Sequence, residues 1–244
     1  MTKQQLIYET VVPVSHGRHA KCSIEAVPGY AVARHINSVP VMAIEFPQVA
    51  AEYTIVFAEN GEDVVPVAIL GVRNQENLFL DSEDNWLANY VPAFIRRYPF
   101  VFSLSDDADT YTLCIDESFS GLNNEGRGDT LFSADGKPTG YIEGVLNFLQ
   151  EYRIQFQNSE MLCKKLKELN LLEPMQADFT LAEGEQLQLA GFQAVNRERL
   201  KALSGETLQQ LFESDELELI YFHLHSLRNF DTIKDRLKAS PAAA

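Results

Sequence analysis

One stretch of the chain limits the fold more than any other. Between Thr139 and about Asn170, apolar residues recur at helical intervals, which is typical of an α-helix with one buried face. The apolar positions are Ile142, Val145, Leu149, Tyr152, Phe156, Cys163, Leu166 and Leu169. The pattern predicts either one long helix or two helices broken near Gln157. Such a helix needs a large apolar surface to cover, and a β-sheet built by the rest of the chain is the obvious one.

The sequence before this helix predicts such a sheet. Asn60-Gly61 separates the apolar runs 54–58 and 64–70, and Asn-Gly supplies the positive φ angles of a tight hairpin turn. A short helix is expected from Glu45 to Glu52, because Pro47 suits its first turn. Four further apolar or alternating runs predict strands, at Val39–Ala43, Leu78–Leu80, Phe100–Leu104 and Tyr111–Glu117.

The C-terminal part predicts mainly helix. A hairpin is expected from Asp178 to Phe192 with Gly184 in its turn. Helices are expected at 196–203 and 206–213, and a longer one from Asp215. The predicted class is therefore α+β, with a mixed or antiparallel sheet in the N-terminal part packed by the long helix and a C-terminal helical region. We expect a β-rich part over 1–137 and a mainly helical part over 138–244, joined in one continuous structural unit.

Composition excludes several classes of partner. The chain has 20 basic and 35 acidic residues, a formal charge of −15, so a nucleic-acid backbone is repelled and no nucleic-acid partner is expected. No apolar run approaches the roughly 18 residues of a membrane-spanning helix. The first ten residues lack the apolar region of a secretory signal, and three widely spaced cysteines fit reduced thiols. We therefore expect a cytoplasmic protein.

Two groups of soft ligands invite a metal-binding interpretation. His16-x-x-His19-x-x-Cys22 either places its ligands on one side of a helical turn around zinc, or is a solvated loop before a strand in which Cys22 is packed. Gly17 argues against the turn, and no fourth ligand is nearby. His223 and His225 would point about 200° apart on a helix, so they cannot share one metal. The sequence therefore predicts neither a metal nor a cofactor.

The segment from Tyr90 to Phe100 holds two prolines, four aromatic residues and two arginines. Pro92 suits the first turn of a short helix, and Pro99 prevents the helix from continuing. Arg96 and Arg97 then fall in the last helical turn, where cations are favoured. We expect both guanidinium groups to face outward and bind an anionic group, beside aromatic side chains that stack on a ligand. The segment predicts a binding site that includes Phe94, Arg96, Arg97 and Tyr98.

Acidic side chains extend this predicted site. The helix dipole favours Glu45 at the start of the short helix and disfavours Glu52 at its end, so Glu52 is expected either to need a cation such as Arg96 or Arg97 or, like Glu45, to be solvated. Asp116 is added as a third candidate. Strand alternation sends Asp116 and Glu117 to opposite faces, so they are no ready-made carboxylate pair.

Several segments together resemble the bacterial SapC family. They are Asn37–Pro40 with Glu45-Phe-Pro and Glu52-Tyr, Val65–Gly71, Tyr90–Phe100, Leu113–Glu117, Leu189–Phe192 and Ile220–Leu227. The resemblance covers nearly the whole chain. It implies a link to a bacterial surface layer, from which the family takes its name, or to outer-membrane uptake systems. It implies no catalytic residues.

Two hypotheses of function remain. The first is a non-catalytic accessory protein that recognises a peptide, a saccharide or a partner protein, with a small-molecule ligand as a further option. The second is an enzyme, or the subunit of one, that acts on a peptide or saccharide. It requires Glu45, Glu52, Asp116, Glu117, Arg96 and His223 to converge in a central cleft, with the pKa of at least one carboxylate raised. The sequence leaves the oligomeric state open.

Overall fold

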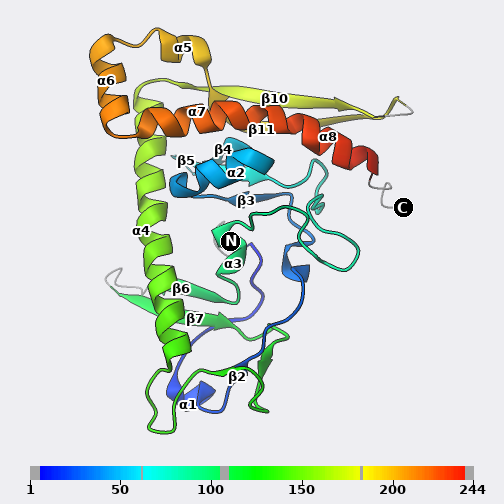
Figure 1. Cartoon of the computed structure of the whole chain (residues 1–244), viewed down its shortest axis with the longest axis vertical. Helices are drawn as coiled ribbons and strands as arrows, with labels where there is room; N and C mark the ends of the chain where they lie inside the picture. The colour runs from blue at the N-terminus through cyan, green and yellow to red at the C-terminus, as the bar shows by residue number, and fades with distance from the viewer. Residues whose placement is uncertain (1–5, 62, 105–109, 182–183, 240–244) are drawn as a thin grey trace. The chain divides into compact units, whose positions relative to one another are not determined.

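The computed structural model describes residues 6–61, 63–104, 110–181 and 184–239. Contacts between Cα atoms divide the chain into two compact units, and each is made of two stretches of sequence. The first contains 1–29 and 93–154, and the second contains 30–92 and 155–244. The predicted α+β class is confirmed, since antiparallel sheets occur together with the long helix α4 (Gly140–Glu168) and a C-terminal helical region (Figure 1).

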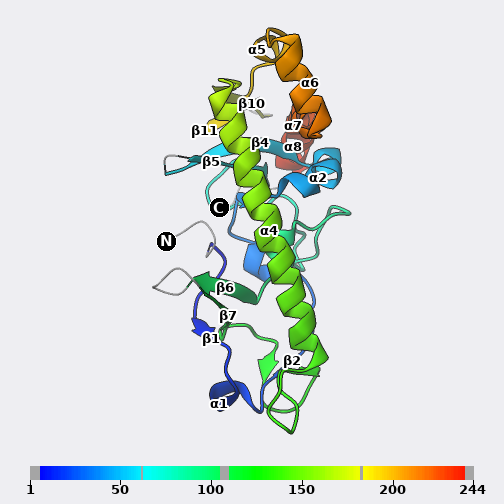
Figure 2. The ribbon, with the colours of Figure 1, turned by 90° about the vertical axis from the view of Figure 1, so that its left-hand side faces the viewer.

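The first unit holds two small antiparallel sheets. Strand β7 (Tyr111–Asp116) is central in one sheet, between β1 (Val11–Pro13) and β6 (Phe100–Leu104). The other sheet has the order β8-β2-β9, with the bounds Leu122–Asn123, Ser23–Ile24 and Asp129–Thr130. The start of α4 runs beside β6 and β7 in both views (Figure 2). The core of this unit contains Cys22, Ile24, Phe100, Ile115, Leu131, Ile142 and Leu149.

The proline-bounded segment forms the predicted short helix before Pro99, although Pro92 and Arg97 lie just outside its bounds. Helix α3 (Ala93–Arg96) follows Pro92 directly, and the N–H of Arg97 donates to the carbonyl of Ala93 at 3.0 Å. The peptide bond between Tyr98 and Pro99 is cis, and β6 begins at Phe100. The segment is therefore one helical turn that leads directly into an apolar strand.

The second unit contains a five-stranded antiparallel sheet of order β10-β11-β4-β5-β3. The predicted Asn60-Gly61 hairpin joins β4 (Thr54–Asn60) to β5 (Asp63–Ile69), with a φ of 67° at Gly61. The predicted hairpin around Gly184 is also present. Its strands, β10 (Leu172–Thr180) and β11 (Gln186–Val195), are longer than predicted. Strand β3 (Ser38–Pro40) is shorter than predicted and is soon followed by a 3-10 turn at Ala43–Glu45.

Helices cover the sheet of the second unit. Helix α7 (Glu216–Ser226) lies against β4 and β11 with α2 (Phe46–Glu52) beside it (Figure 1). The remaining helices are α5 (Arg197–Lys201), α6 (Gly205–Glu213) and α8 (Phe230–Ala239), with a 3-10 turn at Leu227–Asn229 before α8. Phe230 of α8 contacts the rings of Phe179 and Phe192 in the hairpin. The helical character predicted for this region is confirmed.

Helix α4 is a single helix, which decides between the two alternatives that the periodicity left open. It ends before Asn170, whose φ of 51° is the left-handed conformation that stops helices. Ile142 and Leu149 are buried in the first unit, and Cys163 and Leu166 in the second. The division into 1–137 and 138–244 within one continuous unit stays a prediction.

Two local expectations are wrong. Leu78–Leu80 forms only an isolated bridge between Leu80 and Trp86, because no neighbouring strand extends the pairing. His16–His19 forms a short helix, α1, despite Gly17. The expected lack of a secretory signal concerns, in part, residues 1–5, which lie outside the described residues. Among the described helices, none combines the length and apolar character that crossing a membrane requires.

Candidate functional site

Arg97 lies in the interior of the first unit, with only 4% of its surface exposed. Its guanidinium carbon sits 4.4 Å from the ring centroid of Phe94, 4.8 Å from that of Tyr152 and 5.7 Å from that of Tyr8. Cations are attracted to ring faces at such distances. The expectation that both guanidinium groups face outward is therefore wrong for Arg97, because the nearby Phe94 and two tyrosines from distant parts of the sequence enclose it.

Arg96, the preceding residue, is exposed. Its guanidinium carbon lies 5.5 Å from the ring centroid of Phe148 on α4. One step along a helix turns a side chain by about 100°, so neighbouring arginines face different surroundings. The outward orientation predicted for this segment is confirmed for Arg96.

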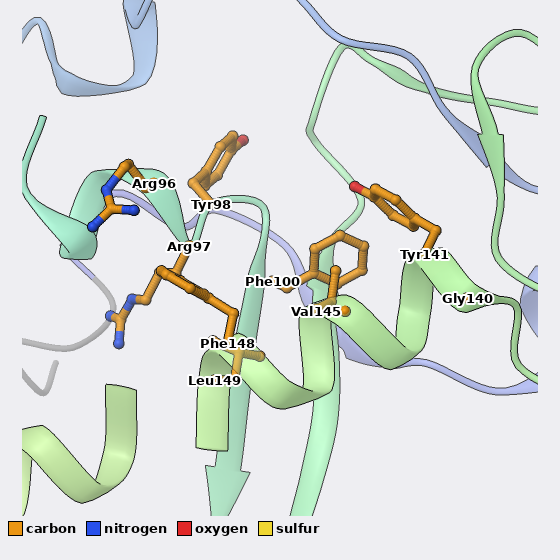
Figure 3. A pocket seen from close by; sticks show the side chains of 10 residues that line it. Arg96, Arg97, Tyr98, Phe100, Gly140, Tyr141, Val145, Phe148 and Leu149 are labelled. Carbon is orange, nitrogen blue, oxygen red and sulfur yellow. The ribbon is translucent and has the colours of Figure 1, made fainter. Parts of the chain in front are cut away.

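Both arginines border an open pocket of about 470 Å³ within the first unit. One wall comes from the end of α3 and the segment that follows it, and the other comes from the first turns of α4 (Figure 3). The lining residues are Arg96, Arg97, Tyr98 and Phe100 from the first wall, and Gly140, Tyr141, Gly144, Val145, Phe148 and Leu149 from the second. Most of the lining is aromatic or aliphatic, which is typical of a ligand pocket with few polar contacts.

Two tyrosines supply hydroxyl groups to this lining. Burial, followed by the charge of Asp116, raises the pKa of Tyr98 to about 12. Burial and then Asp129 also raise the pKa of Tyr141. A raised phenol pKa keeps the proton on the oxygen at neutral pH, so both hydroxyls are hydrogen-bond donors as well as acceptors.

Asp116, a predicted site residue of the same unit, does not line the pocket. It is fully buried at the end of β7. Its carboxylate accepts backbone N–H groups from Glu9 at 2.8 Å, Thr10 at 2.9 Å and Ser118 at 3.0 Å. Three such donors tie this carboxylate to the backbone around β1 and β7, so its role there is structural.

Glu45 and Glu52 belong to the second unit. Glu45 is only 3% exposed and accepts the N–H of Met42 and the hydroxyl of Tyr90, both at 2.8 Å, so the expectation that it is solvated is wrong. Glu52 is half-buried and accepts the N–H groups of Asn89 at 3.0 Å and Tyr90 at 3.1 Å. Backbone donors, rather than a cation, therefore meet the charge that the end of α2 disfavours.

The candidates named only for the enzyme hypothesis are also held in place. His223, in the second unit, is fully buried, and its Nε2 accepts the N–H of Val195 while its Nδ1–H donates to the carbonyl of Ile55, both at 3.0 Å. Burial lowers the pKa of this imidazole to about 4. Glu117, in the first unit, accepts two bonds from the Arg18 guanidinium, at 2.6 and 2.5 Å, and this contact lowers the pKa of its carboxyl.

The His16, His19 and Cys22 spacing does not assemble a ligand set. Nδ1 of His19 accepts the N–H of Ser15, and Cys22 is packed in the core of the first unit, as the second interpretation expected. Burial raises the pKa of the Cys22 thiol, which disfavours the thiolate that a metal requires. Among the described residues, no group of three or more His, Cys, Asp or Glu side chains is arranged to hold a metal ion.

The half of the pocket that α4 supplies was not predicted from the sequence. Tyr141, Gly144 and Phe148 are three to four residues apart, so they share one helix face. Gly144 was the available signal, because glycine is unfavourable inside a helix and invites a reason for its presence. Of the predicted site residues, Arg96, Arg97 and Tyr98 line the pocket, while Phe94 contacts the Arg97 guanidinium. Their role as a site stays a prediction.

Comparison with known proteins bears on the identity of the chain. The family model SapC matches residues 14–233, which is most of the 244-residue sequence. Neither the curated proteins nor the solved structures contain a significant match. The resemblance that the sequence segments carry is confirmed, and the chain belongs to the SapC family.

Proposed function

We propose that this SapC-family chain is a non-catalytic accessory protein that binds the anionic group of a peptide or of a partner protein in the pocket beside Arg96. The observation that carries the proposal is an exposed guanidinium held against an aromatic ring at an open, mainly apolar pocket. A guanidinium offers a planar fork of N–H donors that matches a carboxylate. Aromatic and aliphatic walls then bind the apolar part of the same ligand.

The lining of the pocket favours binding over catalysis. General acid-base catalysis needs, within hydrogen-bond reach of the substrate, a side chain whose pKa lies near the working pH. The raised pKa values of Tyr98 and Tyr141 move both tyrosines further from neutral pH. The described residues that line the pocket include no Asp, Glu or His. The carboxylates of the enzyme hypothesis instead accept structural hydrogen bonds elsewhere, as Asp116 does from the backbone.

The same lining favours a peptide over a saccharide. A sugar presents many hydroxyl groups, and the transfer of each one out of water without a hydrogen-bond partner costs free energy. The described lining offers two arginines and two tyrosine hydroxyls as its polar side chains, with no Asn, Gln, Asp or Glu.

We propose that the protein acts in the cytoplasm in support of surface-layer or outer-membrane uptake systems, on the grounds of its composition and its family.

A binding comparison tests this proposal. A library of short peptides, with anionic and neutral members, and a set of acidic oligosaccharides are offered to the wild type and to Arg96→Ala. We expect anionic peptides to bind the wild type at least about ten-fold more tightly than the variant, because a charge-assisted pair is lost. Arg127→Ala is the matched control, since Arg127 is an exposed arginine of the same unit outside the pocket.

Two results would contradict the proposal. If anionic ligands bind Arg96→Ala as tightly as they bind the wild type, the pocket beside Arg96 does not recognise the anionic group. Mass spectrometry that finds the wild type converting a bound peptide or saccharide into a product would favour the enzyme hypothesis instead. Thermal unfolding of each variant shows whether a loss of binding reflects a loss of folding.

A further inference from the structure

Two glycines leave a strip of helix backbone without side chains in the lining of the pocket. Gly140 and Gly144 are one turn apart on α4, and both line the pocket. A Cβ atom built on either glycine would meet no heavy atom within 4 Å. Neighbouring parts of the protein therefore leave room for side chains here. The glycines keep the pocket open, although at Gly144 glycine disfavours the helix interior.

The positive charge lies close to this strip. Phe148 follows Gly144 by one helical turn, so their positions are about 5–6 Å apart along the helix face. The Arg96 guanidinium carbon lies 5.5 Å from the Phe148 ring centroid. A ligand that reaches both the guanidinium and the strip therefore passes the Phe148 ring, and it needs an anionic group and a bulky apolar group close together.

From this spacing we infer that the pocket binds the C-terminal residue of a peptide. Its α-carboxylate pairs with Arg96, and its large apolar side chain lies over Gly144 between the rings of Tyr141 and Phe148. The C-terminal residue carries both groups on one Cα atom, so the charge and the apolar group are as close as the strip requires. This inference rests on the proposed function and narrows its ligand.

The charge of the lining distinguishes a peptide end from a free amino acid. A free amino acid carries an α-ammonium group, which needs an acceptor or a carboxylate when it leaves water. Among the described residues that line the pocket there is no Asp or Glu. In a peptide this nitrogen is a neutral amide, which the partly open pocket accommodates at lower cost. The C-terminal carboxylate of a peptide is therefore the preferred source of the anion.

Five probes separate these ligands. The reference probe is acetyl-Gly-Gly-Phe with a free carboxylate, and its C-terminal amide removes only the charge. Acetyl-Gly-Gly-Ala removes only the bulky apolar group, and free phenylalanine adds the ammonium. Acetyl-Glu-Gly-Gly-amide carries an anion on an internal side chain. Dissociation constants are measured by isothermal titration calorimetry, or by NMR titration where binding is weak.

Two variants and two controls locate the contact. Arg96→Gln removes the charge, and Gly144→Leu fills the strip without removing a native side chain. Asn147→Leu adds the same side chain at an exposed position of α4 outside the pocket. Arg127→Gln removes a charge from the same unit outside the pocket. Circular dichroism and thermal unfolding confirm that each variant is folded.

We expect the reference probe to bind the wild type at least about ten-fold more tightly than the amide, the alanine peptide and free phenylalanine. Arg96→Gln and Gly144→Leu each weaken this binding by a similar factor, while both controls bind like the wild type. Equal binding of acid and amide, or unchanged binding by Gly144→Leu, overturns the inference. If only the internal glutamate probe binds and needs Arg96, the inference fails but the proposed function stands. If no probe binds, and no anionic library peptide binds the wild type more tightly than Arg96→Ala, the inference and the proposed function both fail.

Discussion

The pocket of the first unit and the α7 surface of the second unit use polar side chains in opposite ways. On α7 and the turn after it, His223, Ser226 and Asn229 are buried, and each bonds to backbone groups of the sheet or of the end of α2. At the pocket, Arg96 is exposed and rests on an aromatic ring.

The difference separates structural polar groups from candidate recognition groups. A buried polar side chain that satisfies backbone groups contributes to stability, because its loss leaves those groups without partners. A surface guanidinium over a ring contributes little to folding, and the role proposed above for Arg96 is recognition. The residue type is a poor guide to its role, since Arg97 and His223 are buried whereas Arg96 and His225 are exposed.

The largest expected effect is that of His223→Ala. It leaves the N–H of Val195 and the carbonyl of Ile55 without their side-chain partner, and it opens a cavity in the core. We expect the free energy of unfolding to fall by about 4 kcal/mol. His225→Ala, at an exposed position on the same helix, changes it by less than about 0.5 kcal/mol. Urea denaturation measures both variants, and equal effects would remove the contrast between the two histidines.

The pH dependence of stability comes next. The pKa of His223 falls from 6.5 to about 4 on folding, because burial disfavours the imidazolium. The unfolded chain therefore binds the proton first, so this stabilisation is fully present above about pH 6.5 and is lost as the pH falls toward 4. The expected loss is about 3 kcal/mol.

Other groups titrate in the same range, so the wild type is compared with His223→Gln. Denaturant unfolding between pH 7 and 4 should give a steeper decline for the wild type than for the variant. Parallel declines would show that His223 does not carry the dependence.

A smaller effect of opposite sign is expected at the pocket. Gly144→Ala adds a methyl group where no heavy atom lies within 4 Å, and alanine favours a helix interior more than glycine does. We expect a gain of about 1 kcal/mol in the free energy of unfolding. Thermal unfolding measures the gain. A fall in the free energy of unfolding would instead mean that Gly144 is needed for packing. The pocket would then resemble the α7 surface of the second unit, where the side chains have structural roles.

The smallest expected effect on stability is that of Arg96→Ala. The side chain is exposed, so the free energy of unfolding should change by less than about 0.5 kcal/mol. Arg97→Ala is its matched partner, with about 3 kcal/mol expected from the loss of packing between three rings. Similar losses for the two variants in urea denaturation would mean that both arginines are architectural.

Local features were predictable from sequence because they depend on residues close together in the chain. The periodicity of α4 reports which face is buried, Asn60-Gly61 supplies the positive φ of its hairpin turn, and Pro92 and Pro99 bound α3. The strand predicted at Leu78–Leu80 did not form, because a strand also needs a neighbouring strand to pair with. An apolar run alone does not indicate whether such a neighbour exists.

The same distinction between local and long-range features applies to the candidate site. The sequence by itself determined the α+β class and the family, and it predicted a binding site in the segment from Tyr90 to Phe100. Only the tertiary structure decided that Arg97 is enclosed by Tyr8 and Tyr152 while Arg96 meets Phe148 beside Gly144. The physical reason is that exposure and pocket shape depend on side chains brought together from distant parts of the chain, and neighbouring positions on a helix face different partners.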